Sequence, residues 1–289
     1  MSNVIGQFDQ RLNPLQHELA DGLVFDARWL ESRGISRQLR SYYVRKGWLQ
    51  PLARSVYRRP PALGAAALET GALGSADLKW QQVLVSLQMV LHVPVILGGR
   101  TALEVQGLGH YVAADGPSVV ELYASAPPPT WLDALQASAR FRVHRAAALF
   151  ATPLPAPLPT TPSALSALGL VNRPWGDRDF PLIMSTPERA ILELLANVPR
   201  QETFHQADML MEGLTGLSPR RLESMLVDCK SVKAKRLFFV LAERHGHAWF
   251  KRLDPAKVDL GRGKRSLAGG GKLHPTYQIS MPEGPDGDR

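Results

Sequence analysis

Residues 36–59 read SRQLRSYYVRKGWLQPLARSVYRR, and the residues that start and end a helix within this stretch decide how the N-terminal part of the chain folds. Ser36 is a good helix N-cap, and Gly47 is the residue type that most readily takes the left-handed conformation past a helix end. This spacing predicts a helix of about ten residues. Two short strands around a turn at Arg54 follow it, a pattern typical of a basic hairpin, or wing.

The two faces of the expected helix differ in chemistry. Leu39, Tyr43 and Val44 fall on one side, as a buried stripe would. Arginine can pair with guanine and glutamine with adenine, each good pair giving about 1–3 kcal/mol of discrimination, while hydroxyl groups suit phosphates. The outward residues have this chemistry: Arg37, Gln38, Ser41, Tyr42 and Arg45.

Positive charge is concentrated in the same region. Residues 28–59 contain nine Lys or Arg and one acid, Glu31, so this window alone carries the net charge of +8 that the whole chain carries. Such a concentration of positive charge favours binding to the phosphate backbone of a nucleic acid, because binding releases the counterions that surround the phosphates. A solvated helical hairpin whose arginines only keep the protein soluble is the alternative.

Length and composition set the remaining bounds. A chain of 289 residues with 45% apolar content can form two domains with real cores. The first twelve residues lack the pattern of a signal peptide, and the apolar window 83–97 is interrupted and too short to span a membrane. Cys229 is the only cysteine, so no internal disulfide or thiolate zinc cage is possible. We therefore expect a cytoplasmic protein with no membrane partner, no metal and no cofactor.

The expected fold class is α+β, with an N-terminal winged helix-turn-helix followed by a larger mixed α/β C-terminal domain. Asp26 and Gly34 bound a first short helix, so helix, turn, second helix and wing fill about 60 residues. The expected parts are the winged helix-turn-helix, connecting helices, a larger α+β domain, and a disordered tail, at residues 1–61, 62–90, 91–282 and 283–289.

Beyond the hairpin, helical and alternating patterns predict the remaining elements. Thr186 and Pro187 make a strong helix start, and Ser218 caps another helix. The proline-rich segment 152–162 is either a spacer or a docking motif. Helices are expected at 8–20, 77–90, 102–106, 132–139, 189–196, 202–213, 219–229 and 232–245, and strands at 91–97, 118–123, 141–144 and 277–281.

Two glycine-rich turns invite a phosphate-site interpretation. Residues 98–101, GGRT, are either an anion-binding turn or a tight strand-to-helix connection. Residues 261–272, GRGKRSLAGGGK, do not fit a P-loop, because neither Gly-Lys pair is followed by Ser or Thr. They lie in a second basic region, residues 220–272, with fourteen Lys or Arg and five acids. This loop is either a DNA-backbone contact or simply solvated.

No catalytic motif emerges. His245 and His247 have no companion ligands at metal-binding spacing and are better interpreted as helix C-terminal caps. Glu188 is expected to be a first-turn acid and Glu193 a solvent-facing residue. We therefore predict that the chain is not an enzyme.

Four later segments carry a family resemblance. LGGRTALEVQGLGHY, STPERAILELL, KSVKAKRLFFVLAERHGHAWFKRLDPAKVDLGRGKR and GGKLHPTYQISMP occupy residues 97–111, 185–195, 230–265 and 270–282. Together they resemble the AbiEi family, antitoxin regulators of type IV toxin–antitoxin systems. The resemblance implies a repressor that binds inverted repeats in its own promoter DNA. It also implies an antagonist of a nucleotidyltransferase-type toxin that need not form a stable complex with it.

The resemblance also implies where DNA would be contacted. Wings of this kind usually have Gly before the Val-Tyr pair, whereas this chain has Ser55, so a turn that needs positive φ would be shaped differently. Basic residues of the C-terminal region are expected to add backbone contacts. The full expected set is Ser36, Arg37, Gln38, Arg40, Ser41, Tyr42, Arg45, Lys46, Arg54, Arg58, Lys233, Lys235, Arg236, Arg262, Lys264 and Arg265.

Two other function classes remain open at this point. One is an enzyme acting on nucleic acid, either a nuclease or a nucleotidyltransferase, targeted by the winged helix. The other is an RNA-binding module, which would read single strands with exposed aromatic side chains. The aromatic residues here fall mostly at core spacing, which disfavours the RNA-binding module.

Overall fold

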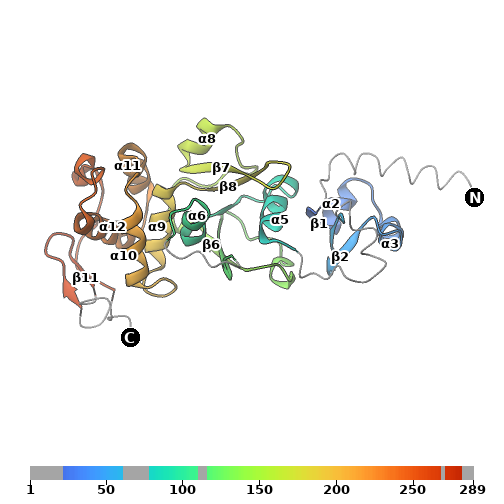
Figure 1. Ribbon diagram of the computed structural model, residues 1–289, viewed down its shortest axis with the longest axis horizontal. Helices are drawn as coiled ribbons and strands as arrows, with labels where there is room; N and C mark the ends of the chain where they lie inside the picture. Colours follow the sequence, from blue (N-terminus) through green and yellow to red (C-terminus); the bar gives the residue numbers. More distant parts are fainter. Residues whose placement is uncertain (1–21, 61–77, 110–115, 268–270, 282–289) are drawn as a thin grey trace, which may run out of the picture.

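The computed structural model describes residues 22–60, 78–109, 116–267 and 271–281. The described chain forms an elongated molecule, with a small N-terminal unit at one end and a three-stranded sheet near the C-terminus at the other (Figure 1). Between them lie a five-stranded mixed sheet and a block of helices. Our expectations for residues 8–20, 62–77 and 283–289 lie outside the described residues.

The N-terminal unit, residues 22–60, contains two helices and a small antiparallel sheet with the order β1-β3-β2. Ser36 caps α3 by accepting a hydrogen bond from the Leu39 amide at 3.3 Å, and Gly47 follows the helix with φ +71°. The expected helix and hairpin are confirmed. The elements are β1 Val24–Asp26, α2 Ala27–Ser32, α3 Arg37–Arg45, β2 Gln50–Ala53 and β3 Val56–Arg58.

Hydrogen bonds between described residues join this unit to the central domain. The Val24 amide donates to Ser86 Oγ at 2.7 Å, and Trp131 Nε1 donates to Asp26 Oδ2 at 3.3 Å. Asp26 also caps α2 by accepting from the Trp29 amide at 2.9 Å. The start of α2 is therefore tied to the central domain through a single carboxylate.

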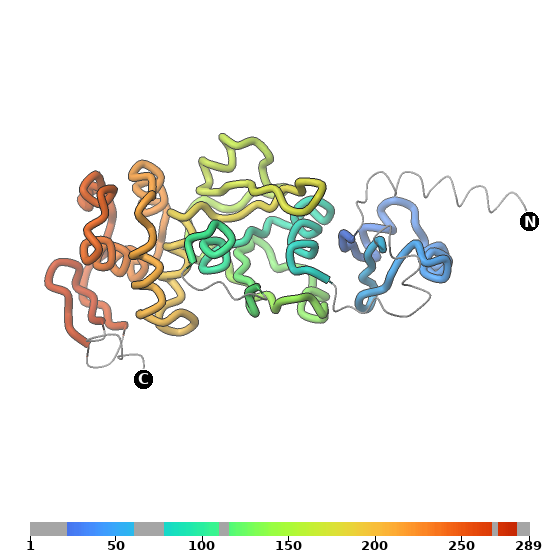
Figure 2. The backbone as a smooth tube through the Cα atoms, in the orientation of Figure 1, coloured from blue at the N-terminus to red at the C-terminus, as the bar shows by residue number. Residues whose placement is uncertain are grey.

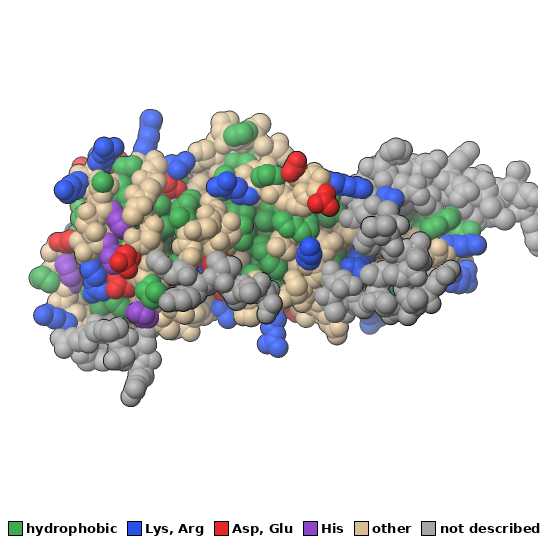
Figure 3. Space-filling view, viewed as in Figure 1, with side chains coloured by type: hydrophobic (Ala, Val, Ile, Leu, Met, Phe, Trp, Pro, Cys, Tyr) green, Lys and Arg blue, Asp and Glu red, His purple; other side chains and the backbone are tan. Residues whose placement is uncertain are grey.

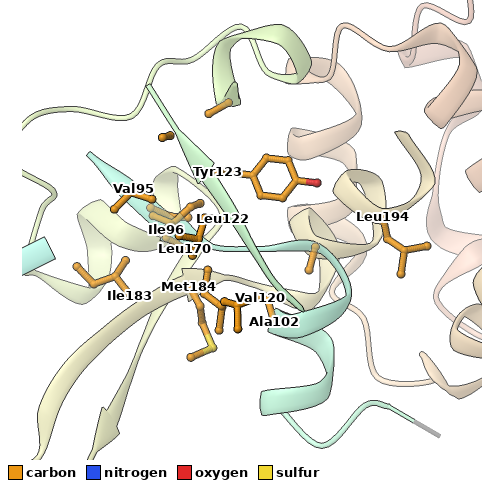
Figure 4. Close-up of a cluster of buried hydrophobic side chains, with 14 of the residues drawn as sticks. Val95, Ile96, Ala102, Val120, Leu122, Tyr123, Leu170, Ile183, Met184 and Leu194 are labelled. Atoms are coloured by element: carbon orange, nitrogen blue, oxygen red, sulfur yellow. The ribbon is translucent and has the colours of Figure 1, made fainter. Parts of the chain in front are cut away.

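The central domain is built on a sheet with the order β6-β5-β4-β8-β7, in which β4 pairs parallel with β8 and antiparallel with β5. Val95, Ile96, Leu122 and Met184 lie in the apolar cluster of the sheet (Figure 4). The elements are the helix α5 Trp80–Val85, π-helix η3 Ser86–Val90, β4 Val95–Leu97, α6 Gly99–Val105, β5 Val119–Ala124, 3₁₀-helix η4 Leu132–Ala134, β6 Arg140–Arg145, α7 Ala146–Leu149, α8 Pro162–Ala167, β7 Leu170–Trp175 and β8 Phe180–Ser185.

The helix expected at 77–90 is present only in part and changes its winding. It begins at Trp80 and continues after Val85 as a π-helix, whose wider turn leaves Met89 exposed and turns Gln88 inward. The Gln88 amide then donates to the Val95 and Ile183 carbonyls at 3.0 and 2.8 Å. These bonds tie the helix to two strands of the sheet, so it belongs to the core of the central domain.

The helical block surrounds α9. Thr186 and Pro187 start α9 as expected, and the helix packs against α6 on one side and α12 on another. Because the helix is covered on so many sides, all eight residues from Glu188 to Leu195 are buried. The elements are α9 Pro187–Asn197, α10 Phe204–Gly213, α11 Pro219–Asp228, α12 Val232–His245, two 3₁₀-helices, η5 Phe250–Arg252 and η6 Pro255–Lys257, and the strands β9 Arg265–Ser266, β10 Lys272–Leu273 and β11 Ile279–Met281.

Several boundary predictions were wrong in extent, for local reasons. The strand expected at 91–97 starts only at Val95, after His92 with φ +51° and after Pro94. The helix expected at 132–139 is a single 3₁₀ turn. The strand expected from Tyr277 starts at Ile279, because Gln278 has φ +52°. Residues 152–161 form no helix or strand, as expected of either a spacer or a docking motif.

Candidate nucleic-acid interface

Helix α3 presents a polar face that the rest of the N-terminal unit leaves uncovered. Leu39 and Tyr43 are buried beneath it, and Tyr42 is half-buried with its ring 5.9 Å from that of Trp48. Arg37, Gln38 and Ser41 are exposed on the opposite side. The helix is therefore anchored by its apolar face and offers its polar face to a partner.

The outward side chains hold few bonds within the protein. Ser41 Oγ donates to the Arg37 carbonyl at 3.1 Å, while Arg37, Gln38 and Arg45 make no side-chain hydrogen bond or ion pair with the residues that the structure describes. Lys46 is exposed, with its ammonium 5.9 Å from the Tyr42 ring centroid. These cations are free to meet an anionic partner without first breaking a salt bridge within the described parts of the chain.

The wing adds one exposed cation at its tip. Arg54 lies between β2 and β3 and is exposed. The next residue, Ser55, has φ +63°, so this turn does require the left-handed conformation that a glycine would adopt without strain. The Ser55 carbonyl accepts a hydrogen bond from the Ala27 amide at 2.9 Å, which joins the wing to the start of α2.

Two residues of the expected contact set are instead buried inside the unit. Arg40 is 7% exposed, and its guanidinium donates to Glu31 Oε1 at 2.9 Å and to the Ile35 carbonyl at 3.2 Å. Arg58 is 1% exposed and donates from Nε to Gln50 Oε1 at 2.6 Å. Both side chains hold the unit together, and neither is presented to a partner.

The basic residues expected in the C-terminal region divide in the same way. Lys233 donates from Nζ to the Ala196 carbonyl at 2.7 Å. Burial of its ammonium lowers the pKa of Lys233, and the nearby charge of Arg200 lowers it further. Lys235 and Arg236 are buried. The exposed members of the set are Arg262, Lys264 and Arg265.

The guanidinium of Arg236 is engaged within the protein. Its guanidinium donates to the carbonyls of Leu260, Gly261 and Gly263 at 2.7, 3.1 and 2.6 Å, and to that of Gln278 at 3.0 Å. Burial lowers its pKa, and the nearby charge of Arg265 lowers it further. Arg236 thus organises the loop that carries the three exposed cations.

The exposed cations of α3 and the wing lie far from those of the C-terminal loop. The wing and α3 are at one end of the long axis, and the C-terminal strands are at the other (Figure 2). Lys and Arg side chains are visible over both ends in the space-filling view (Figure 3). The structure therefore does not bring the sixteen expected contact residues together into one surface.

The strand-to-helix turn at Gly98-Gly99 is occupied by the protein's own carboxylate. The Gly99 amide donates to Glu193 Oε2 at 2.9 Å, and Ser185 Oγ and Arg189 Nε both donate to Oε1 at 2.9 Å. Glu193 is fully buried, so our expectation that it faces solvent was wrong; burial raises its pKa. The turn is a structural connection closed by an internal anion.

Other polar clusters of the described chain are likewise engaged in internal pairs. Glu121 accepts from Arg142 at 2.7 Å and contacts His144 Nε2, and His245 contacts Asp208 at 2.8 Å. Within the residues described, no group of three or more His, Cys, Asp or Glu side chains could hold a metal ion. No helix among them is long and apolar enough to cross a membrane.

The described chain thus joins a small unit, which carries an exposed basic helix and a hairpin, to a larger α+β domain. Two family models match the chain: "Transcriptional regulator, AbiEi antitoxin N-terminal domain" over residues 9–114, and "Transcriptional regulator, AbiEi antitoxin, Type IV TA system" over residues 118–282. The chain therefore belongs to the AbiEi family of transcriptional regulators and antitoxins of type IV toxin–antitoxin systems.

A solved structure supports the overall fold. The crystal structure of the RV2827C protein from Mycobacterium tuberculosis is 17% identical in sequence and has a TM-score of 0.50, with 89% of this chain and 85% of that chain covered. At this identity the likeness concerns the fold alone. No curated protein matches the chain.

Proposed function

We propose that the protein is a sequence-specific DNA-binding repressor that regulates its own toxin–antitoxin operon, with the N-terminal unit acting as a winged helix-turn-helix. The observation that carries the proposal is the outward face of α3, where Arg37 and Gln38 are exposed and without side-chain partners in the described chain. Membership in a family of transcriptional regulators supports it.

The residues that would contact DNA form a smaller set than the sequence suggests. In the reading unit they are Ser36, Arg37, Gln38, Ser41, Tyr42, Arg45, Lys46 and Arg54. Base edges in the major groove would be read by Arg37 and Gln38, and phosphates would be held by the hydroxyls and the remaining cations. Arg262, Lys264 and Arg265 would serve as separate backbone contacts.

The second part of the proposal is antagonism of a nucleotidyltransferase-type toxin, without a stable complex between the two proteins. The family description as a type IV antitoxin supports it. We place both activities in the cytoplasm, on operator DNA with inverted repeats, and we propose no enzymatic step for this chain.

A double substitution tests the reading helix. Arg37→Ala with Gln38→Ala should abolish the preference of the protein for its upstream DNA over a scrambled duplex in fluorescence anisotropy, while thermal unfolding stays unchanged because both side chains are exposed. Arg140→Ala, an exposed arginine in β6, is the matched control and should keep the preference. An undiminished preference in the double variant would remove α3 as the reader.

A further inference from the structure

A cavity of about 520 Å³ is lined by residues of α8, β7 and the N-terminal end of α9. Volumes of about 300–1,000 Å³ are typical of small-molecule sites. Leu165, Leu170 and Val171 give the cavity an apolar wall, and Arg173 and Thr186 are among its polar lining residues. The cavity thus combines an apolar surface with a small number of polar groups.

Two of the polar groups lack partners. Arg173 is exposed on β7, and no side-chain hydrogen bond or ion pair joins it to the described part of the chain. Thr186 is only 5% exposed, yet its Oγ1 has no hydrogen-bond partner among the described residues. A buried hydroxyl without a partner is costly, so its presence beside a cavity indicates a ligand oxygen that would satisfy it.

The backbone adds a third attraction for an anion. Thr186 is the N-cap of α9, an eleven-residue helix, but its side chain makes no capping hydrogen bond. Pro187 has no N–H, and the Arg189 and Ala190 amides donate to the Thr186 carbonyl at 3.1 and 2.8 Å. The Glu188 amide is therefore the group of the first turn that no side chain caps, at the positive end of the helix dipole.

The charges around the cavity leave a positive balance. Glu188 is the opposing charge in the first turn of α9, but its Oε1 already accepts from the Ser218 amide at 2.9 Å and from Arg221 at 3.1 Å. The charge of Arg221, which also lines the cavity, is thus matched by Glu188. The guanidinium of Arg173 stays uncompensated by the residues described.

We propose that this cavity binds a small organic phosphate monoester. Its phosphate would lie on Arg173, on Thr186 Oγ1 and on the first turn of α9, and its ring or apolar portion would lie against Leu165, Leu170 and Val171. The cavity is in the central domain, and α3 contributes no residue to it. Binding is therefore measurable on the full chain without DNA.

Isothermal titration of the full chain tests the site with three probes, each used alone: adenosine 5′-monophosphate, inorganic phosphate and adenosine. We expect saturable binding of the monophosphate, weaker binding of inorganic phosphate and none of adenosine. Arg173→Gln should weaken monophosphate binding at least about tenfold and Thr186→Val about threefold or more, as loss of hydrogen bonds to a charged group implies. Arg140→Gln, an exposed arginine away from the cavity, should change nothing.

Three results would overturn the proposal. The first is that neither phosphate probe binds saturably. The second is that adenosine binds as well as its monophosphate. The third is that monophosphate binding is unchanged in both cavity variants. Thermal unfolding of each variant establishes that it is folded. We expect all three variants to unfold at the temperature of the unaltered protein. Arg173 and Arg140 are exposed, and the Thr186 hydroxyl makes no hydrogen bond with the described residues that the substitution could remove.

Discussion

At the scale of single residues, Ser55 is the point where the wing carries strain. Its φ of +63° is a conformation that costs an L-residue roughly 1 kcal/mol and costs glycine little. Ser55→Gly should therefore stabilise the protein by about 0.5–1 kcal/mol in urea unfolding. Ser41→Gly, the same change within α3, should destabilise it by about 0.5 kcal/mol. Destabilisation by Ser55→Gly would contradict the strained turn.

Arg37 and Arg40 are three positions apart on α3 and have opposite roles. Arg40→Met removes the bonds to Glu31 and to the Ile35 carbonyl, so it should lower the free energy of unfolding by about 1–2 kcal/mol. Arg37→Met should leave the unfolding free energy within about 0.5 kcal/mol and weaken binding to upstream DNA. Denaturant unfolding and anisotropy on the same two variants check the assignment. An Arg40 variant of full stability would show that the bonds of the buried guanidinium contribute nothing.

At the scale of elements, Gly98 makes possible the close approach of the turn between β4 and α6 to β5 and α9. A Cβ atom there would lie 2.4 Å from both Glu193 Oε2 and Tyr123 Cδ2. Gly98→Ala should therefore destabilise the protein by about 1–3 kcal/mol. Gly216→Ala is the matched control, since a Cβ at Gly216 meets nothing within 4 Å and no positive φ is required there. Equal melting temperatures of the two variants would contradict the tight packing.

The elements that could be predicted from the sequence are those that begin at a recognisable capping residue. Ser36, Ser218 and Ser231 all cap helices, because a cap depends on a hydroxyl and the amide three residues later. Strands β7 and β8 were not predicted. Three exposed residues in a row, Asn172, Arg173 and Pro174, hide the alternation of β7.

The candidate site was predictable only in part, for a related reason. Exposure of Arg37 and Gln38 follows from the helical period, but the burial of Arg40 depends on Glu31, which lies on another helix. Glu193 was misassigned because a helical wheel assumes that one face meets water, whereas α6 and α12 cover α9 from different sides. Whether a cationic side chain is exposed or paired within the protein is set by tertiary contacts, which the local sequence does not show.

At the scale of the whole molecule, the separation of the two basic ends predicts separable effects on DNA binding. Replacing Arg262, Lys264 and Arg265 together by Gln should weaken binding to upstream and scrambled DNA equally and reduce the salt dependence. It should leave the preference for upstream DNA intact, because α3 lies at the opposite end (Figure 1). A loss of preference in this variant would place part of the sequence reading in the C-terminal loop.

The most direct test of the repressor proposal is fluorescence anisotropy of the full chain on its own upstream DNA and on a scrambled duplex, across a series of salt concentrations. We predict a preference for the upstream DNA that persists as salt rises, since base contacts by α3 are screened less than contacts to phosphates. Equal affinities for both duplexes that fall together with salt would mean attraction to the backbone alone and would contradict sequence-specific repression.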